Sequence, residues 1–224
     1  MKIIAHIHSD FPDKFGIPRQ SGLVENLIST VIFEPPYRST DALRGLEQYS
    51  HLWLIWQFSE NLDAGWRPLV RPPKLGGNIK KGVFATRSPF RPNPIGLSSV
   101  KLESIIYTKE HGPILQVSSA DLMDRTPIYD IKPYLPITDC HPEAQGGFTE
   151  NLHLEPLQVI LPPETAEKLS ADCRELLIQI LAQDPRPSYQ HDPERIYGLS
   201  FRQYNIRFRV DGKTLTVCEI QTCR

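Results

Sequence analysis

Hydrophobic and polar positions alternate through much of the first two thirds of the chain, in a pattern typical of β-strands. The clearest example is residues 51–58 (HLWLIWQF), where aromatic and branched side chains predict a strand. Residues 2–8 predict an earlier strand, and residues 97–106 with 114–118 predict a β-hairpin. With further short β segments up to about residue 136, these stretches predict an all-β first unit.

The pattern changes after a polar, glycine-containing stretch at residues 138–149. Beyond it the predicted elements are a strand at 154–161, a helix with one apolar face at 163–183, and a hairpin formed by 201–210 and 214–220 around Asp211-Gly212. The chain is therefore predicted to be mainly β, with an all-β domain over residues 1–145 and a small α+β domain over residues 146–224.

Two segments inside the first unit break the alternation. Residues 40–49 predict a short helix, with Thr40 as its N-cap. Residues 65–96 are crowded with proline and glycine, and only 82–86 predict a strand there. Long irregular segments of compact domains are usually functional or disordered. Apolar residues such as Trp66 and Phe84 would anchor this one to a core, which favours a functional segment.

Charge is distributed unevenly, although the net charge of the chain is only −1. No acidic residue occurs between Asp63 and Glu103, and the cations in this interval are Arg67, Arg71, Lys74, Lys80, Lys81, Arg87, Arg91 and Lys101. Trp66 and Phe90 are interleaved with them, which is typical of nucleic-acid-binding surfaces. A solvated basic face is the alternative. On the first interpretation, Arg67, Arg71, Lys74, Lys80 and Lys81 would contact phosphates.

Several common classes of protein are disfavoured. The sequence contains no GxGxxG, P-loop or GxSxG motif, which argues against the usual nucleotide-binding and hydrolase folds. No stretch approaches the roughly 20 apolar residues of a membrane span, and the first residues do not form a signal peptide. Scattered cysteines and histidines predict neither a disulfide framework nor a metal site. We therefore expect a cytoplasmic protein with no metal and no membrane partner.

Four blocks of unusual sequence carry the clearest signal: GIPRQSG at 16–22, WRPLVRPPKLGGN at 66–78, GVFATRSPFRPNPIG at 82–96 and DLMDRTPIYDIKPYLP at 121–136. In these blocks the chain resembles the TsaA-like family, also called YaeB- or TrmO-like, of bacterial tRNA methyltransferases. The resemblance covers the first domain nearly from end to end. LAQDPRPSY at 181–189 extends it into the second domain.

The resemblance implies a fold, a reaction and a set of cofactor contacts. The fold would be a single-sheet β-barrel that binds S-adenosylmethionine without a Rossmann sheet, with a homodimer completing the site. The reaction would be methyl transfer to N6 of threonylcarbamoyladenosine at position 37, beside the tRNA anticodon. By motif match, the cofactor contacts would be Pro18, Arg19, Gln20, Ser59, Glu60, Arg87, Leu97, Asp121, Leu122, Met123 and Asp124.

The residue types agree with this cofactor. Asp121 or Asp124 could accept hydrogen bonds from the ammonium group or the ribose hydroxyls, and Arg87 could bind the methionine carboxylate in bidentate fashion. The alternatives are that the two aspartates form a turn by capping their own backbone, and that Arg87 is a surface cation.

The proposed acceptor is a ureido nitrogen, which is a poor nucleophile because its lone pair is delocalised. Methylation therefore needs removal of a proton or stabilisation of developing charge. Asp130, Lys132 and Tyr134 share one face at period-two spacing, and together with Arg91 and Asn93 they are the catalytic candidates; no single general base can be chosen. A solvent-facing strand edge is the alternative. Arg91 or Lys132 could bind the threonyl carboxylate, and Tyr134 and Phe90 could stack on loop bases.

Two other functions compete with the methyltransferase. One is a non-catalytic RNA-binding barrel that senses S-adenosylmethionine. The other is a hydrolase that uses Asp121 and Asp124 as paired carboxylates, which the basic surroundings disfavour. Residues 150–224 could supply a second tRNA contact or simply stabilise the barrel.

Overall fold

The computed structural model describes residues 1–75, 78–150, 155–187, 189–190 and 192–223. Their N-terminal part forms a closed antiparallel barrel with the strand order β1-β2-β7-β6-β3-β8. The bounds are β1 (Ala5–His8), β2 (Ile28–Phe33), β3 (His51–Gln57), β6 (Ile95–Thr108), β7 (Gly112–Ser118) and β8 (Thr126–Pro133). The barrel closes because β1 pairs with both β2 and β8. The predicted mainly β fold is thus confirmed.

Strand β3 shows why the alternating sequence closes around a core. Leu52, Leu54 and Trp56 are buried inside the barrel, whereas His51, Trp53 and the other alternate residues face outward. Ile7, Val31, Leu115 and Ile128 from neighbouring strands complete the same core. Period-two burial along β3 therefore separates an apolar interior from a more exposed outer face.

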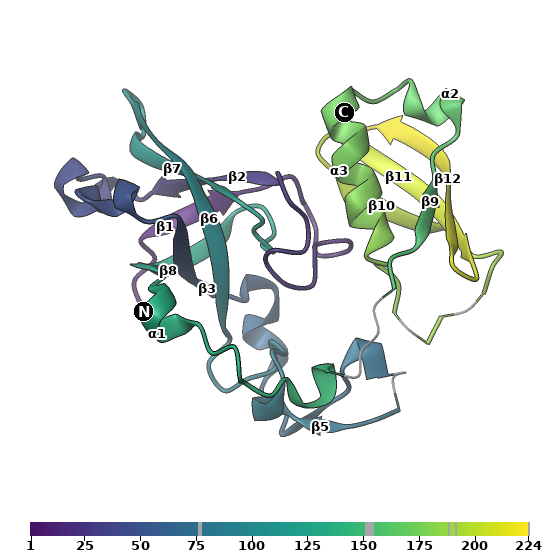
Figure 1. Cartoon of the computed structure of the whole chain (residues 1–224), viewed down its shortest axis with the longest axis horizontal. Helices are drawn as coiled ribbons and strands as arrows, with labels where there is room; N and C mark the ends of the chain where they lie inside the picture. Colours follow the sequence, from purple (N-terminus) through teal and green to yellow (C-terminus); the bar gives the residue numbers. More distant parts are fainter. Residues whose placement is uncertain (76–77, 151–154, 188, 191, 224) are drawn as a thin grey trace.

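The C-terminal part of the chain forms a second, α+β unit with its own sheet (Figure 1). Its described strands have the order β10-β11-β12-β9, with β9 parallel to β12. The bounds are β9 (Gln158–Ile160), β10 (Tyr197–Phe201), β11 (Tyr204–Asp211), β12 (Thr214–Thr222), α2 (Pro163–Ala166) and α3 (Ala171–Ala182). The predicted hairpin at Asp211-Gly212 is confirmed. None of the described helices is long and apolar enough to cross a membrane.

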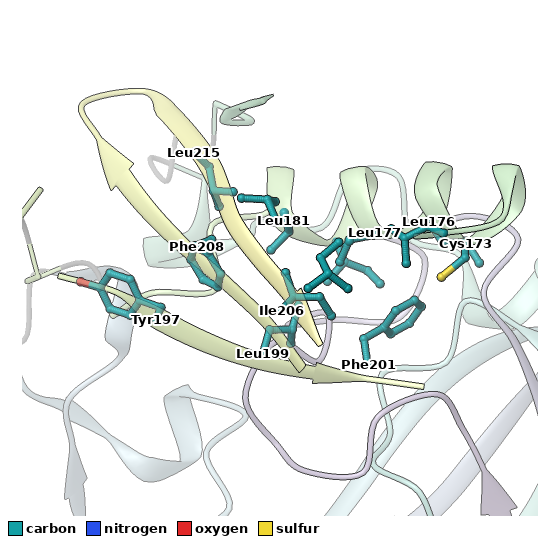
Figure 2. Packing of buried hydrophobic residues seen from close by; sticks show 14 of the residues in the cluster. Cys173, Leu176, Leu177, Leu181, Tyr197, Leu199, Phe201, Ile206, Phe208 and Leu215 are labelled. Carbon is teal, nitrogen blue, oxygen red and sulfur yellow. The ribbon is translucent and has the colours of Figure 1, made fainter. Parts of the chain in front are cut away.

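Helix α3 covers one face of this sheet. Figure 2 shows Cys173, Leu177 and Leu181 pointing from the helix toward Phe201, Ile206 and Phe208 of the strands. The predicted apolar face is thus confirmed, but the single helix predicted over residues 163–183 is wrong. The first helix ends at Ala166, and Ser170 is extended, with a hydroxyl that accepts a hydrogen bond from the amide of Cys173 (3.3 Å). An N-cap starts a new helix at that point.

The loop that follows β1 belongs to the C-terminal core. Phe11, Val24 and Leu27 are buried among the apolar residues of α3 and its sheet, and the purple loop in Figure 1 lies between the two units. Gly16, at φ +90°, packs so closely that an added Cβ would lie 2.0 Å from the Cδ1 atom of Leu199. The two units therefore share apolar side chains from the first 30 residues.

Three predictions of local structure in the first unit are corrected. The helix predicted over residues 40–49 is two 3₁₀ turns, Thr40–Leu43 and Leu46–Gln48, separated by Gly45 at φ +88°. The strand predicted over 82–86 ends at Gly82, because the carbonyl of Val83 turns back to accept from Thr86. The described residues near 136 form the short helix α1 (Pro136–Asp139) instead of a further strand.

The proline- and glycine-rich segment is a folded lobe. Strands β4 (Leu69–Val70) and β5 (Lys81–Gly82) pair in antiparallel fashion and form a small two-stranded sheet. Further 3₁₀ turns in the described residues occur at Pro35–Tyr37, Ser59–Ala64, Pro73–Leu75, Val83–Ala85 and Gly147–Thr149. The lobe is drawn in blue below the barrel in Figure 1.

Candidate functional site

A half-buried carboxylate, Asp121, lies just beyond the end of β7. The hydroxyl of Ser98, on β6, donates a hydrogen bond to Asp121 (Oγ–Oδ1 2.5 Å) and accepts one from the indole of Trp56 on β3 (2.9 Å). Gly96 makes this arrangement possible, since an added Cβ would lie 2.2 Å from the Trp56 ring. Burial raises the pKa of Asp121, and the hydrogen bond from Ser98 opposes that rise. Two barrel strands thus hold one carboxylate that is partly removed from solvent.

A second loop brings cations to this carboxylate. Arg87 donates a hydrogen bond to the side-chain oxygen of Gln20, and its positive charge lowers the pKa of Asp121. Gln20 donates in turn to the carbonyl of Arg19 (2.5 Å). Three segments that are distant in sequence therefore meet in a cluster of Arg19, Gln20, Arg87 and Asp121, called below the Arg87–Asp121 cluster.

The C-terminal unit contacts the cluster through Arg19. The guanidinium of Arg19 donates to the main-chain carbonyl of Arg186 (2.9 Å). Burial lowers the pKa of Arg19, and the charge of Asp184 partly offsets this effect. Arg186 is itself buried and binds Asp184 through its guanidinium (Nε–Oδ1 2.9 Å). The second unit therefore touches the side of the cluster that is formed by Arg19.

A large groove, of about 1380 Å³, opens beside the cluster. Its cations are Arg19, Arg67, Arg71, Lys80, Lys81 and Arg87, and the described residues that line it include no Asp or Glu. Residues 145–149 form part of its wall, and the Lys81 ammonium lies 5.8 Å from the ring centroid of Phe148. We call this feature the cationic groove. A surface of this kind attracts polyanions.

The predicted phosphate contacts converge here. Arg67, Arg71, Lys80 and Lys81 line the cationic groove. The side chain of Lys74 lies outside the described residues. Arg67 also covers the ring of Phe90, at 4.5 Å from its centroid. Of the two aromatic residues proposed to stack on bases, Phe90 is therefore already in contact with a cation.

The other predicted cofactor residues are spread more widely. Asp124 accepts from the amide of Ser9 (3.2 Å), and Leu122 is buried in the barrel core. Met123, next to Asp124, accepts from the hydroxyl of Thr126 through its carbonyl. Pro18 is buried beside Arg19, and Ser59 and Glu60 open the 3₁₀ turn after β3. Asp121 and Asp124 thus have different partners, which disfavours a paired-carboxylate hydrolase.

Leu97 marks a second, smaller hollow of about 380 Å³ on the outer face of the barrel. It is 53% exposed and lies beside Trp53, Ile55 and Lys132. The indole of Trp53 donates to Asp139 of helix α1 (2.7 Å). This outer hollow is lined by residues different from those of the cationic groove.

The five predicted catalytic residues divide between two places. Asp130 and Lys132 form an ion pair on β8 (2.9 Å), and Tyr134 packs against Trp53 on the outer face. Arg91 instead donates to the carbonyls of Val83 (3.1 Å) and Thr86 (2.6 Å). Asn93 accepts from the amide of Ile95 through its carbonyl (2.8 Å). The described contacts of Arg91 thus hold a turn of the lobe.

Sequence reasoning missed several residues of the site. Ser98 and Trp56 hold Asp121, and Phe148 approaches the groove from beyond residue 145. Period-two spacing from Leu52 and Leu54 could have placed Trp56 inside the barrel. Among the described residues, no three or more His, Cys, Asp or Glu side chains are grouped so that they could hold a metal ion.

Known proteins match both units of the chain. The tRNA-methyltransferase O N-terminal domain matches residues 6–140, and the TrmO C-terminal domain matches residues 155–223. The chain is 42% identical over 215 residues to the tRNA (adenine(37)-N6)-methyltransferase of Escherichia coli K12, covering 92% of this chain and 91% of that protein. It is 49% identical over 164 residues to the protein of the same name from Eikenella corrodens, covering 73% and 92% of the two chains. A crystal structure of TrmO from P. aeruginosa has a TM-score of 0.78 at 33% identity, covering 98% and 95%.

Proposed function

The chain belongs to the tRNA-methyltransferase O family and is a tRNA (adenine(37)-N6)-methyltransferase, and we propose that its methyl donor is S-adenosylmethionine and its acceptor is threonylcarbamoyladenosine. The resemblance predicted from four sequence blocks is thereby confirmed at the level of the family. The match over both units of the chain, at 42% identity to the E. coli enzyme, carries the assignment of the reaction.

One structural relationship supports the assignment of residues. Arg19, Gln20 and Arg87 belong both to the Arg87–Asp121 cluster and to the lining of the cationic groove. The groove, at about 1380 Å³, exceeds the roughly 300–1,000 Å³ that is usual for a small-molecule site. A donor site and an RNA site can therefore share this groove.

The cluster suits the polar groups of S-adenosylmethionine. Arg87 is exposed and offers a guanidinium fork to a carboxylate, while Asp121 and Gln20 supply acceptors for an ammonium group or for ribose hydroxyls. When bound, S-adenosylmethionine supplies an electrophilic methyl group on a sulfonium. The residues of this chain bind and orient the donor. Pro18, Ser59, Glu60, Leu97, Leu122, Met123 and Asp124 remain proposed cofactor contacts on the family resemblance alone.

The cations of the groove suit the tRNA anticodon loop. Arg67, Arg71, Lys80 and Lys81 would contact phosphates, which positions the loop without reading its sequence. Lys74 belongs to the same proposal through its place in the sequence. The absence of carboxylates among the described lining residues supports a polyanionic partner, because it leaves the attraction of these cations uncancelled.

The acceptor nitrogen must lose a proton, and three of the five candidates for this task lie on or just after β8, on the outer face of the barrel. Asp130, Lys132 and Tyr134 gather there, whereas Arg91 and Asn93 lie in or beside the lobe. We propose that a homodimer unites them, with the outer face as its interface. Leu97 and Ile137 support this interface, since they are 53% and 92% exposed beside the outer hollow and α1.

The place of action follows from the proposed substrate. Because the substrate is tRNA, we propose that the enzyme works in the cytoplasm. All four cysteines are free, and this is compatible with a reducing compartment.

The experiment that tests the reaction uses purified protein, radiolabelled S-adenosylmethionine and two tRNA pools, one with threonylcarbamoyladenosine and one from cells that cannot make it. We expect label in the modified pool only. Label in neither pool, with donor binding intact, would indicate a non-catalytic sensor. Label in both pools would mean that the acceptor is a different atom.

A further inference from the structure

The side chain of Phe84 is 73% exposed, so the prediction that this residue anchors the lobe to a core is wrong. It lines the cationic groove between the cations of the lobe and Arg87. Two other aromatic rings line this groove, and like Phe84 each lies beside a cation: Phe90 beside Arg67 and Phe148 beside Lys81. Both are also less exposed than Phe84. Phe84 is therefore the most accessible aromatic surface that the described lining of the groove presents.

The backbone beneath Phe84 is held from several sides. Val83, which precedes it, is buried, and its amide donates to the carbonyl of Pro68 (3.0 Å). The carbonyl of Val83 accepts from the amide of Thr86 (3.1 Å), the hydroxyl of Thr86 (2.9 Å) and the guanidinium of Arg91 (3.1 Å). Phe84 therefore sits at the tip of an anchored 3₁₀ turn, and a flexible loop does not explain its exposure.

Arg91 connects the turn with the ring. Its guanidinium carbon lies 5.6 Å from the centroid of Phe84 while its Nη1 binds the carbonyls on either side of that residue. An aromatic ring beside a fixed guanidinium is an arrangement suited to stacking with a nucleobase. Arg91 therefore supports the turn that carries Phe84, in addition to its proposed catalytic role.

We propose that Phe84 is a stacking platform for an unpaired nucleobase of the anticodon loop, next to the base that is methylated. The proposal rests on the proposed function, because it takes the occupant of the groove to be RNA. Unpaired loop bases expose an apolar face that pairs with aromatic side chains. The surrounding cations bind the phosphates of the same nucleotides, so the groove offers both contacts that a single strand requires.

The test compares Phe84→Ala, Phe84→Leu and Phe84→Trp with the wild type, using a tRNA that carries threonylcarbamoyladenosine. Stacking on an aromatic side chain corresponds to roughly 5- to 100-fold in affinity per base. We expect Phe84→Ala and Phe84→Leu to weaken tRNA binding by about this factor, and Phe84→Trp to restore it. Tyr107→Ala, an exposed aromatic on the β6–β7 hairpin, is the matched control and should bind tRNA as the wild type does.

Salt dependence separates stacking from charge. Phosphate contacts release counterions and stacking does not. The Phe84→Ala line of log affinity against log salt should therefore lie below that of the wild type with an unchanged slope. Quenching of indole fluorescence in Phe84→Trp by an anticodon stem-loop RNA is a direct second reading. Thermal unfolding of each variant confirms that the turn remains folded.

The outcomes distinguish this proposal from the proposed function. If the wild type fails to methylate tRNA, the proposed function itself fails. If it methylates tRNA while Phe84→Ala and Phe84→Leu match it in affinity and kcat/KM, the stacking platform alone is overturned. A Phe84→Ala protein that binds tRNA normally but sediments as a smaller species would instead assign Phe84 to a contact between two copies of the chain, and would also overturn the proposal.

Discussion

The guanidinium of Arg19 donates a hydrogen bond to the main-chain carbonyl of Arg186, 2.9 Å away and 167 positions later in the sequence. The turn that presents this carbonyl is fixed by a forked contact, in which Arg186 binds both carboxylate oxygens of Asp184 (2.9 and 3.1 Å). Asp184 has φ +49°, a left-handed conformation that is uncommon outside glycine. The ion pair therefore holds an otherwise unfavourable turn against the Arg87–Asp121 cluster.

Replacing Arg186 should affect both stability and donor binding. Arg186→Met removes both guanidinium hydrogen bonds from the partly buried carboxylate of Asp184, and we expect the free energy of unfolding to fall by about 2 kcal/mol. We also expect the KM for S-adenosylmethionine to rise more than kcat falls, since Arg19 and Gln20 lose their support. Urea unfolding and steady-state kinetics measure the two effects. Arg186→Lys keeps the positive charge but lacks the planar fork of donors. Its stability and its KM for S-adenosylmethionine should therefore lie between those of the wild type and those of Arg186→Met.

An unchanged KM in a destabilised Arg186→Met protein would show that the turn supports only the fold. If Arg186→Met weakens only tRNA binding, the turn supports the binding of RNA in the groove and not the binding of the donor. Either result would contradict the link to the donor site that the Arg19 contact indicates.

Much of the secondary structure of both units could be predicted from local sequence patterns. Strand β3 follows from HLWLIWQF, and the apolar face of α3 follows from helical spacing, because both patterns express burial on one side of a regular element. The wrong predictions concern segments whose sequence is compatible with more than one type of local structure. Residues 40–49 are compatible with an α-helix, but Gly45 in the left-handed region breaks them into 3₁₀ turns.

The candidate site was only partly predictable, because its contacts connect distant segments. The family blocks drew attention to Gln20, Arg87 and Asp121, which the fold brings together. Nothing local to Arg91 indicates that its guanidinium is used by the carbonyls of Val83 and Thr86. The packing of Phe11 into the C-terminal core is equally invisible in the sequence around it.

That packing predicts how a fragment of residues 1–145 behaves. Phe11, Val24 and Leu27 would lose the surfaces of α3 and its sheet, and each such side chain contributes roughly 1.5–3 kcal/mol when buried. We expect the fragment to self-associate and to unfold at lower temperature than the full chain. Size-exclusion chromatography and thermal unfolding measure this. A monomeric fragment as stable as the full chain would show that the barrel is independent of these contacts.

A matched triple variant controls for other effects of truncation. Serine at positions 11, 24 and 27 should make the 1–145 fragment more soluble, because the newly exposed surface becomes polar. The same substitutions should destabilise the full chain, where these side chains are buried. If the triple variant is more soluble as the fragment but less stable as the full chain, the poor behaviour of the fragment is caused by loss of the core that the two units share.

Asp121 should make stability depend on pH in a defined direction. Burial raises the pKa of its carboxyl in the folded state. Its stabilising contribution is therefore present below the ordinary aspartate pKa of about 4 and is lost as the pH rises through the folded-state value. We expect Asp121→Asn to match the wild type in acid and to exceed its stability at neutral pH, with Tm higher by roughly 2–4 °C for each kcal/mol gained. Urea unfolding from pH 4 to pH 8 measures this.

Although Asp121→Asn should stabilise the protein at neutral pH, the same substitution should weaken its binding of S-adenosylmethionine. Asp121→Asn removes the negative charge beside Arg87, so we expect weaker binding of S-adenosylmethionine by a more stable protein. Ser98→Ala is the matched variant, because it removes the hydrogen bond that lowers the pKa of Asp121 and should steepen the loss of stability with pH. A flat stability difference between pH 4 and pH 8 would contradict the partly buried charge.

The cations of the groove predict a change in the salt dependence of tRNA binding. Lys80 and Lys81 line the groove, and each phosphate contact to a single strand contributes about 0.7 to the slope of log affinity against log salt. The double variant Lys80→Ala, Lys81→Ala should therefore bind tRNA more weakly at low salt, with the slope reduced by roughly 1.4. Lys213→Ala, which removes an exposed cation paired with Glu155 on the C-terminal hairpin, should leave the slope unchanged. Filter binding from low to moderate salt measures both slopes. Equal slopes in the double variant and the wild type would mean that the anticodon loop lies elsewhere, because two phosphate contacts cannot be lost without losing their counterion release.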